Sequence, residues 1–119
     1  INTLDFLHAA CKVLDDKKGE DLIILDVRKL STITDYYVIA TGANSRHIKA
    51  LADEVQRVLK QQGRSTYRQS GTPESGWIVS DFLDFVVHLF EAKSREAYDL
   101  EGLWKDAPQI PLQPDRASV

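Results

Sequence analysis

The amino-acid sequence predicts an α/β fold of the α+β type, a single domain in which helices flank a mixed five-stranded sheet. Three observations lead to this prediction. The chain has 119 residues, which is enough for one core and too few for two. Segments with helical periodicity alternate with short apolar segments typical of strands. A long helical connection and several short turns join these segments, which gives both parallel and antiparallel strand pairs.

The first expected element is an amphipathic helix over residues 2–17. Apolar side chains recur there at helical spacing, at Leu4, Leu7, Cys11 and Leu14. Asn2 is a good cap for the first turn, and Gly19 follows the last turn. We therefore expect this helix to bury one apolar stripe.

Two strands and a second helix are expected next. The runs DLIILDVRKL (21–30) and DYYVIATG (35–42) are too short for helices, and their apolar content predicts strands buried on both faces. A helix is predicted over 44–62, capped by Asn44 or Ser45. Its apolar face consists of Ile48, Leu51, Val55, Val58 and Leu59.

The following residues predict three more strands and a last helix. RSTYRQ (64–69) is the weakest strand candidate, and SGTPESG (70–76) has the composition of a loop. Two strands, 77–81 and 85–90, are joined by a tight turn. A helix is predicted over 91–104, which gives the element order α-β-β-α-β-β-β-α.

The chain divides into a domain over residues 1–104 and a Pro-rich tail over 105–119. Three of the four prolines fall in this tail. Such a composition predicts an extended strap or a disordered segment and not a second domain.

Composition and charge exclude several classes of function. A formal net charge of −3 argues against binding nucleic acid mainly by neutralising its phosphates. Cys11 is the single cysteine, so neither an internal disulfide nor a thiolate metal cage can form, and we expect Cys11 to be a small core residue. The longest apolar runs are far shorter than the roughly 20 residues that span a bilayer. We therefore expect a soluble, cytoplasmic protein with no membrane partner.

The turn TGANSRH (41–47) is a candidate anion site. A strand, a glycine and a helix N-terminus present free N–H groups there, and Ser45, Arg46 and Lys49 are the candidate contacts for a phosphate or RNA. The alternative is a plain β-α turn, because neither a G-x-G-x-x-G motif nor a Walker lysine is present. Basic groups in a first helical turn oppose the helix dipole, which favours a surface role for Arg46.

The stretch SGWIVSDFLDFVVHLF (75–90) combines strand-forming residues with acid, base and metal-ligand types. Alternation with a period of two places alternate side chains of each strand on one face. If the turn pairs the two strands, six candidate site residues form one patch: Trp77, Val79, Asp81, Asp84, Val86 and His88.

This patch has three interpretations. The first is a catalytic or metal site, but the patch contains neither a nucleophile beside a base nor a second histidine for a metal. A protein interface has the right mixture, since a tryptophan anchor, apolar neighbours and rim charges are typical of interfaces. The third interpretation is that Trp77 is half-buried core and that Asp81 and Asp84 merely flank a turn. His8 and His47 have no ligand partner at helical spacing and are expected to be ordinary surface residues.

Three ordered stretches resemble the ribosomal silencing factor family, also called the Iojap-like family. They are DLIILDVRKLSTITDYYVIATGANSRHIKALADEV, GWIVSDFLDFVVHLF and REAYDLEGLW, and the resemblance covers about residues 4–104. It implies a fold related in shape to nucleotidyltransferases, with no enzymatic activity and no cofactor. It further implies binding to the fourteenth protein of the large ribosomal subunit, at the face that meets the small subunit. Subunit joining and translation are then reduced, notably under nutrient limitation, while organelle relatives act in assembly of the large subunit.

Several family residues have counterparts in this sequence. The resemblance places Trp77, Asp81, Asp84 and His88 at motif positions, together with Ser45, Arg46, Tyr98 and Trp104. Leu83 is a departure, because the family commonly has glycine at this turn. The hairpin is therefore expected either to bend differently or to gain apolar contact area at Leu83.

Other functions stay open beside translational silencing. A nucleotidyltransferase-like enzyme would hold metal through an Asp-x-Asp-type pair, but Asp81 and Asp84 are three residues apart and the acidic-x-acidic pair is Asp99/Glu101, in the last helical segment. No metal seat is therefore expected. A large-subunit assembly role with a minor ribosomal RNA contact, and a homodimer when the protein is free, are also left open.

Overall fold

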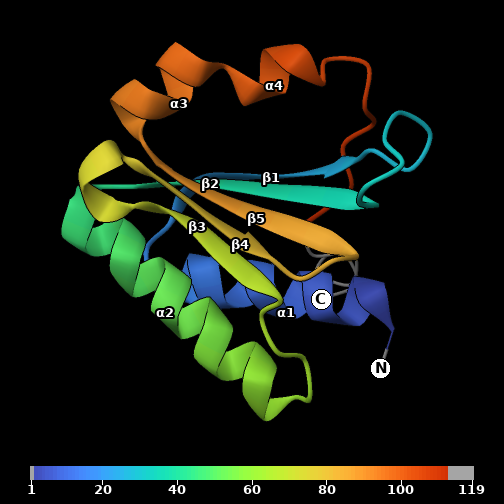
Figure 1. The fold of residues 1–119 in the computed structure, drawn as a ribbon, viewed down its shortest axis with the longest axis horizontal. Coiled ribbons are helices and arrows are strands. Elements are labelled where there is room, and N and C mark those ends of the chain that lie inside the picture. The colour runs from blue at the N-terminus through green and yellow to red at the C-terminus, as the bar shows by residue number, and fades with distance from the viewer. Residues whose placement is uncertain (1, 113–119) are drawn as a thin grey trace, which may run out of the picture.

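The computed structural model describes residues 2–112, which form a five-stranded sheet between two helical layers (Figure 1). Helices α1 and α2 cover one face, and α3 and α4 lie over the other (Figure 1). In chain order the elements are α1 (Thr3–Asp16), β1 (Glu20–Asp26), β2 (Tyr36–Gly42), α2 (Ser45–Gln61), β3 (Arg68–Thr72), the 3-10 helix η1 (Pro73–Ser75), β4 (Trp77–Asp81), β5 (Phe85–Glu91), α3 (Ala92–Tyr98) and α4 (Leu100–Leu103).

The sheet is mixed, as predicted. Its strand order is β1-β2-β5-β4-β3, with β2 and β5 parallel and every other neighbouring pair antiparallel. Helix α2 therefore carries the chain from β2 past two strand positions to the far edge of the sheet. No helix in residues 2–112 is long and apolar enough to cross a membrane.

β1 is an edge strand whose central residues are buried on both faces as predicted: Ile24 belongs to the core cluster under α1 and α2, and Leu25 to the cluster on the opposite face. The strand ends at Asp26, and only Ile24 and Leu25 are buried. The tail covers this edge: Asp26 N donates to Pro108 O (2.8 Å), and Ile110 N donates to Ile24 O (2.9 Å). Residues 108–110 are thus an extended strap, and residues 113–119 lie outside the described part of the chain.

The other edge strand, β3, begins four residues later than predicted. It runs over Arg68–Thr72, and all five of its residues are exposed, which explains its weak apolar signal. Gly71 has φ +82°, and a Cβ there would come within 2.1 Å of Trp77 O. Part of the predicted loop 70–76 is therefore strand, because glycine permits this close approach of the two backbones.

The helix predicted over 91–104 is two helices. The break is at Asp99, whose φ is +47° and whose side chain accepts a hydrogen bond from Gly102 N (3.2 Å). Asp99 therefore ends α3 and caps α4.

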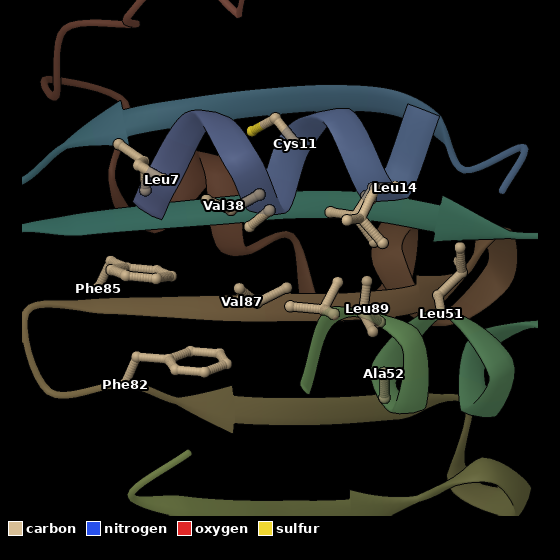
Figure 2. Close-up of a cluster of buried hydrophobic side chains, with 14 of the residues drawn as sticks. Leu7, Cys11, Leu14, Val38, Leu51, Ala52, Phe82, Phe85, Val87 and Leu89 are labelled. Atoms are coloured by element: carbon tan, nitrogen blue, oxygen red, sulfur yellow. The ribbon is translucent and has the colours of Figure 1, made fainter. Parts of the chain in front are cut away.

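The main core lies between the sheet and helices α1 and α2 (Figure 2). Leu7, Leu14, Leu51, Val87 and Leu89 are fully buried there. Each such side chain contributes roughly 1.5–3 kcal/mol through burial. Cys11 belongs to the same cluster as predicted, and burial raises the pKa of its thiol to about 12.

His47 and His8 are not ordinary surface residues, in contrast to the prediction. His47 Nδ1 accepts from Ala43 N (2.8 Å), so Nε2 carries the proton and donates to Lys17 O (2.8 Å). This histidine joins the start of α2 to the end of α1. His8 lies within hydrogen-bond distance of Leu4 O (2.9 Å) and Pro111 O (3.2 Å), between α1 and the tail.

Candidate protein-interaction face

The β4–β5 hairpin brings most of the predicted site residues onto one face of the sheet. The register pairs Trp77 with Phe90, Val79 with His88, and Asp81 with Val86. Side chains paired across neighbouring strands lie on the same side. Five of the six predicted residues therefore share the face opposite α1 and α2.

Asp84 is the sixth predicted residue, and it does not join this face. Its Oδ2 accepts hydrogen bonds from Arg64 Nη2 (2.9 Å) and from Thr3 Oγ1 (3.4 Å), at the start of α1. The preceding residue, Leu83, has φ +73°, which breaks the strand alternation. The prediction that Asp84 lies beside Asp81 on one surface is therefore wrong.

Trp77 and His88 form the centre of the face. The indole Nε1–H donates to His88 Nδ1 over 3.1 Å. Because indole is only a donor, His88 is the neutral tautomer with its proton on Nε2. Burial lowers the pKa of His88 to about 4. Its Nε2 has no hydrogen-bond partner among the described residues. His88 is therefore a buried support for Trp77 and not an exposed acid or base.

An aromatic cluster continues from this pair toward α3 and α4. Trp77 lies 4.9 Å from Phe90 and 4.6 Å from Tyr98, measured between ring centroids. On the other side of His88, Tyr37 contacts the imidazole edge-on at 4.9 Å and Trp104 at 5.3 Å. Rings in offset or edge-on contact gain about 0.5–1.5 kcal/mol beyond their burial.

Tyr37 is a member of the face that the sequence analysis missed. It lies on β2, where the parallel register pairs it with Val86. Its pKa is raised, first by burial and then by the carboxylate of Asp81. The alternation in DYYVIATG shows that Tyr37 and Ile39 share a side, but only the pairing of β2 with β5 shows which side.

We call Tyr37, Trp77, Val79, Asp81, Val86 and His88 the Trp77 face. Tyr37, Trp77, Val79 and Asp81 are half-buried, while Val86 and His88, on the strand between them, are buried. Arg68 pairs with Asp81 in the β3–β4 register and adds a positive charge at the rim. The face thus presents apolar and aromatic edges with few charges, a composition typical of the centre of a protein interface.

Arg95 anchors the helices that border the Trp77 face, and the sequence analysis also missed it. Its Nη1 donates to Asp21 O (2.7 Å) and Thr41 Oγ1 (2.8 Å), and its Nε donates to Glu101 (3.0 Å). The Arg95 side chain is only 12% exposed. These bonds connect α3 and α4 to β1 and β2, so the cover over part of the sheet is fixed.

The candidate anion contacts Ser45, Arg46 and Lys49 lie apart from the Trp77 face. They belong to the first turns of α2, which covers the opposite face of the sheet (Figure 1). Lys49 Nζ is paired with Asp53 at 3.1 Å. Asp53 and Glu74 line the same shallow hollow as the three candidates, which offsets its positive charge.

The acidic-x-acidic pair is occupied by structural contacts. Asp99 caps α4, and Glu101 is paired with Arg95 at 3.0 Å. Over residues 2–112, no group of three or more histidine, cysteine, aspartate or glutamate side chains is placed to hold a metal ion.

A family model described as "Ribosomal silencing factor during starvation" matches residues 1–119. The chain belongs to the ribosomal silencing factor family. A ribosomal silencing factor from Halalkalibacterium halodurans is 35% identical over 92% of this chain and 93% of its own length. The relative from Haemophilus influenzae is 40% identical over 78% of this chain and 91% of its own.

Solved structures and organelle relatives agree with this membership. A crystal structure of a protein from Chromobacterium violaceum matches with a TM-score of 0.85 and 35% identity, covering 93% of this chain and 91% of that chain. A mouse protein named "Mitochondrial assembly of ribosomal large subunit protein 1" is 30% identical over 77% of this chain and 42% of its own length. The silencing factor family is regulatory and is not known for catalysis, so the enzyme hypothesis receives no support.

Proposed function

We propose that this protein represses translation in the cytoplasm by binding the large ribosomal subunit through the Trp77 face. The proposed partner is the fourteenth protein of that subunit, as the family resemblance implies. A protein bound there would occupy the surface that the small subunit needs. Subunit joining would then be blocked sterically, with no chemical step and no cofactor.

The observation that carries this proposal is the half-buried tryptophan on an incompletely covered aromatic face. Trp77 is oriented from below by His88 and from the side by Phe90 and Tyr98. A rigid aromatic side chain loses little entropy on binding, which is why tryptophan is frequent among interface hot spots. The preorganised Trp77 face is therefore suited to a folded protein surface.

The charges at the rim would act mainly on the rate of association. Asp81 and Arg68 are the charged groups that flank the Trp77 face. Rim charges of this kind change on-rates and salt dependence more than final affinity. We therefore assign the main part of the affinity to Trp77 and Val79.

Sucrose-gradient sedimentation of purified ribosomal subunits tests the proposal. We expect the protein to migrate with the large subunit and to reduce formation of joined ribosomes. A matched pair of variants identifies the surface: Val79→Asp on the Trp77 face should abolish both effects. Val58→Asp, on α2 and equally half-buried, should abolish neither if the variant is folded. Absence of the wild-type protein from the large-subunit fraction would refute the proposal.

A second candidate is a role in assembly of the large subunit, which the name of the mouse relative favours. An assembly factor would bind incomplete particles, and a minor RNA contact through Arg46 would then help. Arg46→Glu should in that case reduce the salt dependence of binding. Accumulation of incomplete large subunits in cells lacking the protein would favour assembly, and normal subunits with excessive joining would favour silencing.

A further inference from the structure

Several segments that carry exposed apolar side chains meet at one end of the sheet. Seven large apolar residues are exposed in the described chain: Leu4, Leu30, Ile33, Tyr67, Leu83, Tyr98 and Leu103. The first five come from four segments that meet at the β4–β5 turn. Three hydrogen bonds tie these segments to the turn: Thr3 to Asp84, Thr34 to Leu83 O, and Tyr67 N to Asp81 O. Exposed apolar residues that lie close together mark interaction sites more often than singly scattered ones do.

Leu83 is the least expected member of this group. It has φ +73° and its side chain is 52% exposed, although a leucine in the left-handed region is sterically disfavoured. Its backbone is fixed on both sides: Leu83 N donates to Asp81 Oδ1 (2.8 Å), and Leu83 O accepts from Thr34 Oγ1 (2.9 Å). Glycine would satisfy the same backbone bonds without strain. Folding alone therefore gives no reason for a leucine at this position.

Ile33 and Leu30 lie in the loop that contacts this turn. The bond from Thr34 to Leu83 O, together with that from Asp35 N to Asp84 O (3.1 Å), holds the loop against the hairpin. Ile33 is 86% exposed and Leu30 is 48% exposed. We call Leu30, Ile33 and Leu83 the turn-end cluster.

We propose that the turn-end cluster is a second contact surface, which inserts into an apolar concavity of the protein that covers the Trp77 face. This inference rests on the proposed function and extends it to a second surface. The two surfaces are continuous, because Asp81 belongs to the Trp77 face and accepts the hydrogen bond from Leu83 N. One partner can therefore contact both.

The charges around the turn-end cluster favour a protein partner over RNA. Arg28 is paired with Asp26 (2.7 Å) and Arg64 with Asp84 (2.9 Å). Lys29 lies close enough to the Asp26 carboxylate to lower its pKa, and Arg68 pairs with Asp81 in the β3–β4 register. A phosphate backbone needs a positive excess and offers no apolar surface to Ile33 or Leu83. An apolar socket on a folded protein matches both features.

Binding of the full chain to purified bacterial large ribosomal subunits tests the inference. Leu83→Gly removes the side chain and relieves the backbone. Lys18→Gly is the matched control, since Lys18 is an exposed residue with φ +72° in the α1–β1 turn. We expect Leu83→Gly to weaken binding about tenfold, Ile33→Ser to weaken it by a smaller factor, and Lys18→Gly to leave it unchanged. Neither glycine variant should lower the midpoint of thermal unfolding.

Three results would overturn the inference. If Leu83→Gly binds as tightly as wild type while Trp77→Ala does not, the second surface is refuted and the proposed function stands. If the wild-type chain does not bind large subunits at all, both fail. If the wild type sediments as a dimer that Leu83→Gly dissociates, with subunit binding unchanged, the cluster contacts a second copy and not the ribosomal partner.

Discussion

The two faces of the sheet are built differently. The face toward α1 and α2 is closed and aliphatic, and its leucines and valines are fully buried. The opposite face carries aromatic rings, a hydrogen-bonded histidine and a half-exposed aspartate, and α3 and α4 cover only part of it. The closed face contributes to stability through burial. The Trp77 face combines stability with surface that remains available, so mutations on the two faces should separate unfolding from binding.

The largest effect is expected on the closed face. Leu51→Ala removes a fully buried side chain, and the cavity left behind should lower the free energy of unfolding by about 2–5 kcal/mol. Urea denaturation measures this loss. Val79→Ala is the control on the Trp77 face, where the loss should be nearer 1 kcal/mol because the side chain is already half-exposed. Equal losses at the two positions would contradict the difference between the faces.

Acid should destabilise the protein through His88 on the Trp77 face. The pKa of His88 is about 4 in the folded protein against 6.5 for an unperturbed histidine, so the unfolded chain binds the proton more readily. The contribution of His88 to stability is therefore complete above pH 6.5 and is lost progressively as the pH falls toward 4. At pH 4 the free energy of unfolding should be about 3 kcal/mol lower, because each unit of difference between the two pKa values corresponds to about 1.36 kcal/mol.

Urea denaturation of wild type and His88→Gln between pH 7 and 4 measures this loss. Glutamine can accept the bond from Trp77 Nε1 but does not titrate in this range. Subtracting the free energy of unfolding of His88→Gln from that of wild type at each pH cancels the contributions of the other titrating groups. Parallel stability curves for the two proteins would show that His88 is not the responsible residue.

The next effect separates binding from folding. Trp77→Ala should weaken binding to large ribosomal subunits by at least about 2 kcal/mol, since a central tryptophan is a typical hot spot. Trp77→Phe keeps the contacts with Phe90 and Tyr98 but removes the indole N–H. The affinity of Trp77→Phe for large subunits should lie between those of wild type and Trp77→Ala, as measured by co-sedimentation at several protein concentrations. Wild-type affinity in a folded Trp77→Ala protein would exclude Trp77 from the interface.

The smallest effect is expected at the N-terminal turns of α2. Lys49→Ala breaks the ion pair between Lys49 and Asp53. The side chains of both residues are more than half exposed. Pairs at this spacing on a helix surface contribute about 0.3–0.5 kcal/mol. The midpoint of thermal unfolding should therefore fall by about one or two degrees, and the affinity for large subunits should be unchanged. A larger loss of binding would assign this turn to an RNA contact.

Local patterns predicted those parts of the Trp77 face that depend on neighbouring residues in sequence. The alternation in 77–81 and 85–90 places Trp77, Val79 and His88 on one side, and a tight turn fixes their pairing. The position of Asp84 off this face was not predicted, because it depends on the positive φ of Leu83, and the spacing of apolar residues carries no information on a single backbone angle. The membership of Tyr37 in the Trp77 face was not predicted, because its neighbours on the face come from the parallel pairing of β2 with β5, nearly fifty residues further along the chain.

The same distinction applies to the fold. Helices α1 and α2 were predicted nearly to their ends, because their apolar stripes repeat within the helix itself. The edge position of β1 was not predicted, since a run rich in isoleucine and leucine is compatible both with an edge strand and with a central strand. What closes that edge is the tail, which is 80 residues or more further along the chain.

The strap at residues 108–110 limits how this sheet can associate. It covers the edge of β1 at residues 24–26, and neither Pro108, in the strap, nor Pro111, directly after it, has an N–H with which to bond a further strand. At the other edge of the described sheet, all five residues of β3 are exposed, so a further strand would add more readily there. Two molecules joined edge to edge through β3 would have a strap at each end of the combined sheet. The strap therefore disfavours growth of the sheet by strand addition at residues 24–26 of β1.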